Sequence, residues 1–566
     1  MKRIFSIFMT SMLLLAGCNN LNLSPLAEGS SENWYLSEEE ILMSINDLYK
    51  NSFFPLDIIH GPDSWTDDWI DRENLTPVTN GTINGEWSVA NNDYWLSSYK
   101  AIARCNTILL HLEKQTELSG RKRLLYEAEV KFMRATQYSR LISYFGDVIF
   151  YTEPLELNEA FQMARTDKRI VLQKIYEDYD FASEYLPVSY GSSIQKATKG
   201  AALGMKARIA LYMSDYETAK TASDLCIKLN EYTLETNYPN LFLTKTRMND
   251  EYVFILPRSV EYGVTFGVKN IVSRNVGGFA QFDPSWDLFC SFLCTDGLPI
   301  DESPLFDPHN PFKNRDPRCG YTIVEFQTPH LGFMYQPHPD SLEIMNFSTG
   351  KKTKNNDTRA NAQYASFNGL LWKKGVDESW LENGYNVAPN QIILRFADVL
   401  LIYAEAKIEL NEIDQSVLDA LNRVRARAYG ISDISQTDKY PAIVMASQKE
   451  LRKILRIERR MEFAWEGHRY MDIIRWRLAE KVLNSWNYGL LDQKALVENV
   501  IKPGLWFFAE TPQIDDDGVA DFSGLYEKGY IKRITLRIFD KEKQYLWPLP
   551  SKDILINKNL KQNPGY

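Results

Sequence analysis

The sequence predicts a mainly α-helical protein: four pairs of helices form a scaffold, and an irregular loop-rich region with short strands packs on it. Apolar residues recur at helical spacing through residues 34–230 and 391–482. Gly, Pro and Asn punctuate residues 231–390 and 483–545, which favours loops and short strands there. A capping box, Ser37-Glu38-Glu39-Glu40, marks the start of the first helix.

The predicted loop and helices follow one another along the chain in this order. After the helix that begins at Ser37, residues 57–91 are rich in Asp, Asn, Gly and Trp and predict a long loop. Two helices follow, over about 93–114 and 121–145. The four predicted pairs are Leu124–Phe145 with Lys168–Leu186, Ala201–Met213 with Asp215–Leu229, Phe396–Leu410 with Gln415–Ala428, and Ser447–Trp465 with Gly467–Val482. Small and large residues alternate in the second pair, a pattern typical of tetratricopeptide repeats.

Short strands are predicted where β-branched and aromatic residues cluster in the loop-rich parts. The two clearest runs are Tyr252–Leu256 and Tyr321–Val324. We expect both to pack on the helical scaffold.

The N-terminus carries the signature of an exported lipoprotein. Lys2 and Arg3 precede an apolar stretch over residues 4–15, which is too short for a normal membrane span. Leu15-Ala16-Gly17-Cys18 then resembles a lipobox, so we expect residues 1–17 to be a signal peptide and Cys18 to be lipidated. The alternative, a secretory signal followed by a chance cysteine, explains this residue order less well. Residues 18–33 are polar and form the expected tether.

Composition and charge exclude some classes of function for this protein. The 566 residues are 24% charged and 13% aromatic, and the formal net charge is −10. This acidic balance excludes the basic footprint that a nucleic-acid partner needs. After the apolar N-terminus no segment resembles a transmembrane helix, because the most apolar one, residues 392–408, contains four charged side chains.

The densest charge pattern lies between Glu458 and Arg475. Paired carboxylates in this segment could act as general acid and base. However, every carboxylate has an Arg within helical reach, which lowers a pKa instead of raising it. We therefore predict a structural lattice of ion pairs, with Ile454, Ile457, Met461, Ala464 and Trp465 facing the core.

The motifs of the common enzyme classes are missing from the sequence. None of the six His residues lies in H-E-x-x-H, and there is no G-x-S-x-G, P-loop or G-x-G-x-x-G pattern. Residues 515–518 (D-D-D-G) lack the spacing of a calcium loop and predict an exposed turn. The cysteines after Cys18 are odd in number and are expected to be packed and unpaired. We predict no catalytic residues, no metal and no cofactor.

The long loop supplies the candidate ligand site. Flat aromatic rings beside short polar side chains suit sugars, which present C–H faces and hydroxyl groups. The alternative is that the Trp residues fill the gap between the loop and the helices. The six candidate residues are Trp65, Asp67, Asp68, Trp69, Arg72 and Trp87. Tyr335 and His338 form a second candidate rim, whereas Trp95, Trp476 and Trp547 are assigned to the core.

Several segments together resemble the RagB/SusD family of Bacteroidetes outer-membrane lipoproteins. The matching segments, in chain order, are residues 21–25, 128–148, 294–300, 394–406, 421–428, 458–475 and 546–550 with 563–566. Two examples are L-R-F-A-D-V-L-L-I-Y-A-E-A at 394–406 and the closing N-P-G-Y. The resemblance covers essentially the whole mature chain, so we expect residues 34–566 to form one SusD-like domain whose C-terminal motif spans 546–566.

This resemblance implies a fold with four tetratricopeptide-like helix pairs and a partner, a SusC-like TonB-dependent transporter. Members capture glycans or other nutrients and are generally not enzymes. The shared motifs map to scaffold helices, so no ligand-binding residue is transferred individually. Asn19-Asn20 departs from the acidic residues that often follow the lipidated cysteine in surface-exported members. The resemblance therefore implies outer-membrane anchoring more strongly than exposure on the cell surface.

We therefore predict a lipid-anchored, non-catalytic glycan-binding protein of the outer membrane. Two alternatives remain: a peptide-capturing member of the same family, and a surface glycoside hydrolase that uses two carboxylates.

Overall fold

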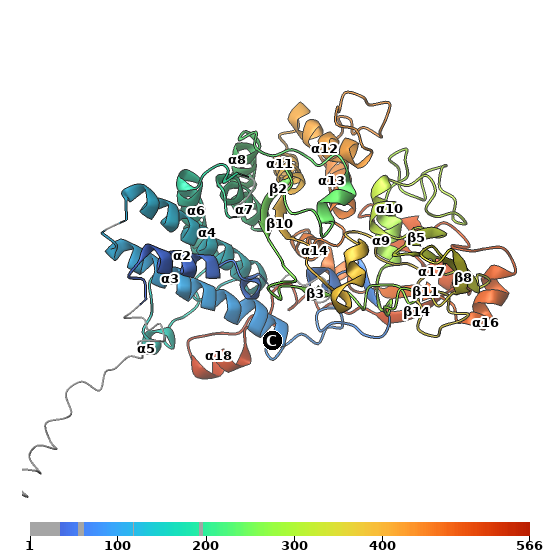
Figure 1. The fold of residues 1–566 in the computed structure, drawn as a ribbon, viewed down its shortest axis with the longest axis horizontal. Coiled ribbons are helices and arrows are strands. Elements are labelled where there is room, and N and C mark those ends of the chain that lie inside the picture. The colour runs from blue at the N-terminus through green and yellow to red at the C-terminus, as the bar shows by residue number, and fades with distance from the viewer. Residues whose placement is uncertain (1–33, 55–60, 117, 192–195) are drawn as a thin grey trace, which may run out of the picture.

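The computed structural model describes residues 34–54, 61–116, 118–191 and 196–566. The predicted signal peptide, the lipobox with Cys18 and the tether lie outside the described residues. Figure 1 shows an elongated molecule with helices α2 to α8 at one end and α11 to α14 near the middle. The other end holds short helices and most of the strands.

The described chain is mainly helical, as predicted. The scaffold helices are α2 (Glu38–Asp47), α3 (Ser97–Lys114), α4 (Gly120–Phe145), α6 (Lys168–Tyr185), α7 (Lys199–Tyr212), α8 (Tyr216–Ile227), α11 (Phe396–Glu409), α12 (Gln415–Ala428), α13 (Gln448–Glu462) and α14 (Arg469–Arg475). Short polar side chains cap the first turns of many of these helices. Ser37 and Glu40 form the predicted capping box, and Thr198, Asp215 and Ser447 each accept a backbone N–H of the first turn.

Three of the four predicted helix pairs pack as pairs: α4 with α6, α7 with α8, and α11 with α12. Neighbouring pairs also contact each other through α6 with α7 and α8 with α11, so the helices form a continuous stack. The fourth pair differs from the prediction, because the helix expected over Gly467–Val482 is divided into α14 and α15 (Ala479–Val482). Arg477 adopts a φ of 56°, and the Leu478 N–H bonds the Ile473 carbonyl, which ends α14 in a Schellman-type turn.

Two glycines on α7 allow close approach of neighbouring segments. Gly200 and Gly204 lie one turn apart, and a Cβ at either position would collide with the ring of Tyr232 or the side chain of Leu394. Leu394 belongs to β10 (Gln391–Arg395), which pairs antiparallel with β2 (Tyr252–Leu256), one of the two predicted strands. The small residues of α7 therefore let β10 lie directly against the helix stack.

The loop-rich region is built from small antiparallel sheets. β5 (Thr328–His330), β6 (Phe333–Tyr335), β7 (Glu343–Asn346) and β8 (Lys351–Lys354) form a four-stranded sheet. The two-stranded sheets pair β1 (Trp69–Asp71) with β4 (Phe282–Pro284), β3 (Phe266–Gly267) with β9 (Asn386–Val387), β11 (Trp486–Leu490) with β14 (Ile531–Leu536), and β12 (Gln513–Ile514) with β13 (Ala520–Asp521). The remaining α-helices are α5 (Leu157–Ala160), α9 (Trp286–Ser291), α10 (Pro317–Thr322), α16 (Gln493–Leu496), α17 (Ser523–Glu527) and α18 (Ser551–Ile556).

The strand predicted at Tyr321–Val324 is wrong, because residues 317–322 form α10. The Asp316 side chain caps this helix and Pro317 occupies its first turn, which together favour a helix start over a strand.

Two large hydrophobic clusters form most of the core of the described residues, and two small clusters add to it. The larger one joins the helix stack to the C-terminal motif through residues such as Phe132, Leu401 and Trp547. The second lies under the loop-rich region around Trp286, Trp372 and Phe508. The five cysteines in the described part of the chain are buried and unpaired, as predicted. Across the same residues, the helices are too short or too polar to span a bilayer.

Candidate functional site

The predicted ligand loop is attached to the loop-rich region by strand β1. Trp69, Ile70 and Asp71 pair with Pro284, Asp283 and Phe282 of β4. The 3₁₀ turn Pro62–Trp65 precedes this strand and is buried. Much of the sequence from 61 to 71 is therefore an interior segment, which positions each of the six candidate residues differently.

Trp65 and Trp87 pack into an aromatic cluster. The Trp65 ring is 1% exposed and contacts Trp87, Tyr94, Tyr470 and Trp547 edge-on, with ring centroids 5.0–5.8 Å apart. Trp87 is half-buried against the same Trp547, at 4.9 Å. The structure thus places both rings between the loop, the helix stack and the C-terminal motif, which is the gap-filling arrangement that was the alternative to stacking on sugar.

Asp67 and Asp68 form buried ion pairs with two arginines. Arg460 Nη2 lies 2.8 Å from Asp67 and 2.6 Å from Asp68, and Arg469 Nη2 lies 2.8 Å from Asp67. Burial alone would raise the pKa of Asp67, but the two guanidinium groups lower it below its usual range. Arg460 and Arg469 come from α13 and α14, so these contacts fix the loop to the scaffold.

Burial decides which of the six residues a ligand can reach in this conformation. Trp65, Asp67 and Asp68 are at most 1% exposed and surrounded by protein partners, so a ligand does not reach their side chains in this conformation. Their contact with a ligand stays a prediction. Trp69 is 6% exposed but borders a cavity. Trp87 remains partly exposed, whereas the Arg72 side chain is 9% exposed.

The cavity beside Trp69 has a volume of about 160 Å³. Its walls include Trp69, Phe282, Asp71, Asn74, Asn487 and Arg537. Burial raises the pKa of Asp71, although its carboxylate accepts the Glu73 N–H and the Gln281 amide. An aromatic wall beside carboxylate and amide groups can hold a polar ring that carries hydroxyl groups.

Arg72 extends from the end of β1 towards two other loops. Its Nη1 donates hydrogen bonds of 2.7 Å to the carbonyls of both Phe279 and Tyr364. Its guanidinium also lies over the Tyr364 ring, 5.1 Å from the centroid. Because two carbonyls share one donor, the three loops are held together at this point.

The side chains carried by those two loops are exposed aromatic rings. Phe279 is 40% and Tyr364 is 45% exposed, and Lys269 lies over the Phe279 ring at 5.1 Å. We call Arg72, Phe279 and Tyr364 the Arg72 platform. Neither ring was predicted from the sequence, although each lies in a stretch rich in Gly, Asn or Gln, as residues 57–91 are rich in Asp, Asn and Gly.

The second predicted rim is only partly exposed. Tyr335 is 1% exposed, and its hydroxyl donates to the Gly369 carbonyl. His338 is half-buried and lies 5.0 Å from the ring of Trp506 in an edge-on contact. Trp506 and His338 are both partly exposed and form a second aromatic surface.

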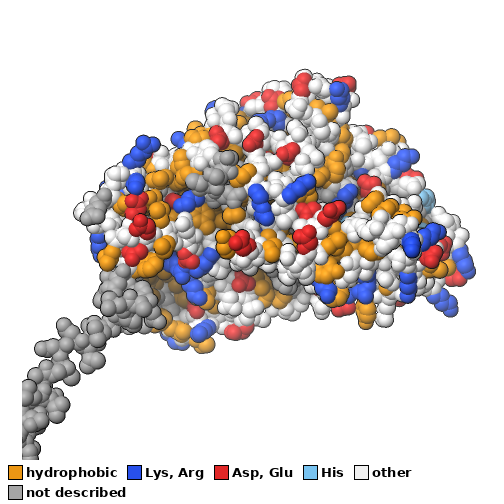
Figure 2. Space-filling model, in the orientation of Figure 1, with side chains coloured by type: hydrophobic (Ala, Val, Ile, Leu, Met, Phe, Trp, Pro, Cys, Tyr) orange, Lys and Arg blue, Asp and Glu red, His pale blue; other side chains and the backbone are white. Residues whose placement is uncertain are grey.

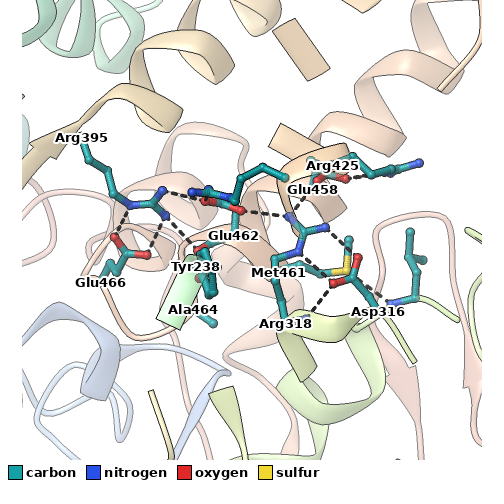
Figure 3. Close-up of polar contacts among 12 residues, drawn as sticks. Tyr238, Asp316, Arg318, Arg395, Arg425, Glu458, Met461, Glu462, Ala464 and Glu466 are labelled. Atoms are coloured by element: carbon teal, nitrogen blue, oxygen red, sulfur yellow. Dashed lines mark hydrogen bonds and ion pairs between the residues drawn. The ribbon is translucent and has the colours of Figure 1, made fainter. Parts of the chain in front are cut away.

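The Glu458–Arg475 segment forms the predicted lattice of ion pairs (Figure 3). Arg318 lies between Asp316, Glu458 and Glu462, at 2.7–3.0 Å, and Arg395 contacts Glu251, Glu462 and Glu466 at 2.6–2.7 Å. Arg427 bridges Glu251 and Glu462 from α12, and Arg425 pairs with Glu458.

The arginines of the lattice keep the Glu462 and Asp472 carboxyl groups ionised. Burial alone would raise the pKa of Glu462, but Arg427, Arg395 and Arg318 lower it to about 2. The pKa of Asp472 is likewise lowered, against the effect of burial, by Arg459 and Arg475. A general acid for glycoside hydrolysis needs a raised pKa, so these groups fit a structural role and not an acid–base pair.

The surface of the face seen in Figure 2 has no dominant charge. Acidic, basic and hydrophobic side chains alternate over the helical end and over the strand-containing end. Within the described ranges, no group of three or more His, Cys, Asp or Glu side chains is arranged to hold a metal ion.

Comparison with known families gives two adjacent matches. Residues 250–566 match the model described as "SusD family", and residues 40–211 match the model described as "Starch-binding associating with outer membrane". Among individual relatives, SusD-like protein P25 of Formosa agariphila is 25% identical over 506 residues, covering 83% of this chain and 88% of the relative. A SusD-like protein of Bacteroides ovatus is 23% identical and covers 86% of this chain and 85% of its own.

Solved structures share the fold. A SusD-like carbohydrate binding protein from Bacteroides fragilis is 28% identical, with a TM-score of 0.74 over 93% of this chain and 99% of its own. A second SusD-like protein from the same species, 22% identical, also gives a TM-score of 0.74 over 95% of this chain and 99% of its own. Both resemble the whole arrangement of helix stack and loop-rich region.

Proposed function

The chain belongs to the SusD family, and from this premise we propose that it is a non-catalytic glycan-binding protein that passes oligosaccharides or polysaccharides to a SusC-like TonB-dependent transporter. The proposal includes a lipid anchor at Cys18 in the outer membrane, with the folded domain on the cell surface. The carbohydrate-binding relative from Bacteroides fragilis supports the ligand class.

The observation that carries the proposal for this chain is the Arg72 platform. Arg72 holds two exposed rings on separate loops, and aromatic faces pack well against the C–H faces of sugars. Trp69 and Asp71, which border the cavity, belong to strand β1 directly before Arg72, and the cavity can accept hydroxyl groups. We propose Phe279 and Tyr364 as the stacking residues, Arg72 as their positioning residue, and Trp69 with Asp71 as a second contact. Trp87 stays a predicted contact at the edge of the loop.

Glycan-array binding followed by calorimetry tests the proposal. The full chain with Cys18→Ala, which cannot be lipidated, is screened on an array of neutral and acidic glycans together with a peptide set. Tyr364→Ala and Phe279→Ala are then each expected to weaken binding of the glycan by about 1–3 kcal/mol, which is about a tenfold to hundredfold loss of affinity. Phe161→Ala is the matched control, because Phe161 is also 40% exposed but lies in the helical part.

Three results would contradict the proposal. Capture of peptides and no glycan would favour the peptide-capturing alternative. Release of reducing ends from a bound glycan would favour a glycoside hydrolase. Full affinity in both ring variants would place the glycan site elsewhere, with His338 and Trp506 as the next surface to test.

The anchor and the partner need separate experiments. Cys18→Ala is expected to leave the protein soluble after cell lysis, whereas the lipidated protein should resist high-salt washing because its acyl chains are buried in the bilayer. Affinity purification of the lipidated protein from detergent-solubilised outer membranes should recover a TonB-dependent transporter. Recovery without any such transporter would contradict the proposed partnership.

A further inference from the structure

A second cavity, of about 350 Å³, lies on the helical scaffold away from the Arg72 platform. It forms where the start of α6, the α7–α8 turn, the end of α14 and residues 541–546 meet. Its volume is within the range of small-molecule sites. It shares no lining residue with the cavity beside Trp69.

Cationic residues outnumber acidic ones in the lining of this cavity. Lys168, Arg477, Lys541 and Lys543 all border it, and Glu542 is the one acidic residue in the lining. Arg475 also borders it but is neutralised by Glu405 and Asp472, so it adds little net charge. Four cations around one cavity contrast with a chain whose formal net charge is −10.

These four cations have few acidic partners. Lys541 lies 3.8 Å from Glu480, a long ion pair. Throughout the described residues, Lys168, Arg477 and Lys543 form no ion pair with a carboxylate within 4.0 Å. Like charges that converge without counter-charges repel one another, and a bound anion would relieve that repulsion.

Aromatic rings hold two of the cations in place. The Arg477 guanidinium lies 4.0 Å from the Tyr545 ring centroid, and Lys543 Nζ lies 5.6 Å from that of Tyr566. The Tyr545 hydroxyl is buried next to the backbone of Glu480 and the Arg477 side chain. Two of the cations are thus held at the border of the cavity by tyrosine side chains.

We propose that this cavity binds an oxyanion, the carboxylate or sulfate group of a small polar ligand such as an acidic sugar. Ammonium and guanidinium groups donate charge-assisted hydrogen bonds to such oxygens. Three of the cations, Lys168, Arg477 and Lys541, are exposed, so a ligand can enter from solvent. The site is independent of the proposed glycan platform, because its lining residues come from the scaffold and the C-terminal segment.

Calorimetry on the full chain with Cys18→Ala tests this site. Sodium sulfate, inorganic phosphate and glucuronate are titrated separately, and glucose serves as the neutral counterpart of glucuronate. All titrations are matched in ionic strength with sodium chloride, because salt screens exposed charges. The test variant is Lys168→Ala with Lys543→Ala. The control is Lys494→Ala with Lys552→Ala, which also removes two positive charges, both of them exposed and outside this cavity.

Saturable binding of at least one oxyanion and no binding of glucose is the expected result. The test variant should bind that oxyanion at least tenfold more weakly, while the control variant binds as the parent. The probe that binds most tightly identifies the chemical group of the ligand. Glucuronate would indicate a carboxylate, sulfate would indicate a sulfate ester, and phosphate would indicate a phosphorylated ligand. The proposal fails if no probe binds up to about 50 mM, a concentration that would detect even millimolar affinity. It also fails if both double variants bind equally.

Discussion

Arg72 donates a 2.7 Å hydrogen bond from Nη1 to the carbonyl of Tyr364 and also stacks on the ring of that residue, 5.1 Å from its centroid. The same nitrogen bonds the Phe279 carbonyl, so one side chain sets the relative position of two exposed rings. A ligand that stacks on both rings would depend on this arrangement, because a positioned ring loses less freedom on binding.

Arg72→Ala is therefore expected to weaken glycan binding about tenfold, even if Arg72 does not touch the glycan. The double variant Arg72→Ala/Tyr364→Ala should lose less affinity than the sum of the two single losses, since both changes remove the same positioned ring. Calorimetry measures the cycle, and circular dichroism checks the fold. Strictly additive losses would instead indicate that Arg72 and Tyr364 act independently.

Trp65→Ala tests the buried aromatic cluster. Removing a fully buried indole leaves a cavity, so the free energy of unfolding should fall by about 3–5 kcal/mol. Urea denaturation measures the loss, and Phe161→Ala, at an exposed ring, should change stability by about 0.5 kcal/mol or less. If Trp65→Ala leaves stability unchanged and abolishes glycan binding, Trp65 is a ligand contact and not a structural residue.

The contrast between Trp65 and Asp472 shows what the sequence could and could not predict. The partners of Glu462, which are Arg318, Arg395 and Arg427, lie far from it in the chain and were not visible in the local pattern. Asp472, by contrast, pairs with Arg459 and Arg475 of its own segment, as the charge pattern of that segment predicted. The capping box at Ser37 and strand β2 were predicted in the same way, from neighbouring residues. Interactions between near neighbours in the chain are visible in the sequence.

The sequence did not show that Asp67 and Trp65 lie in the interior of the protein. Aromatic and acidic residues in one loop are typical both of a sugar-binding surface and of a buried plug. The distinction depends on Arg460 and Arg469, which lie 393 and 402 residues after Asp67 in the chain, and on Trp547. Phe279 and Tyr364 were missed for the same reason, because Arg72 joins them only in the folded chain.

Glu462→Gln tests the lattice. The substitution keeps the size of the side chain but leaves Arg318, Arg395 and Arg427 with one buried counter-charge fewer. The free energy of unfolding at pH 7 should fall by about 3 kcal/mol. Glu177→Gln, in an exposed pair with Lys174, should cost about 0.5 kcal/mol or less. Affinity for the bound glycan should be unchanged, and its selective loss with full stability would overturn the structural assignment.

The same variant has a defined pH dependence. The folded-state pKa of Glu462, about 2, is below the ordinary value of 4.5. The stabilisation from its charge is thus fully present above about pH 4.5 and is lost as the pH falls towards 2. The stability difference between the parent and Glu462→Gln should shrink in that window. A difference that stays constant would show that the charge of Glu462 contributes nothing.

The pH dependence of stability expected from Asp63 is opposite to that expected from Glu462. Burial, and then the nearby Asp68, raise its pKa from 3.8 to about 7, while the Gly467 N–H and Lys374 favour the ionised form. Because the folded-state pKa is raised, its contribution is fully present below about pH 3.8 and is lost as the pH rises through about 7. Asp63→Asn cannot ionise and should escape this loss. From pH 5 to pH 8 the parent should therefore lose about 2 kcal/mol of stability relative to Asp63→Asn.

Urea denaturation at both pH values measures this difference in stability. Asp438→Asn, at an exposed position, is the control, and its stability should follow that of the parent. Parallel pH profiles for the parent and Asp63→Asn would mean that Asp63 ionises as freely in the folded protein as in the unfolded chain.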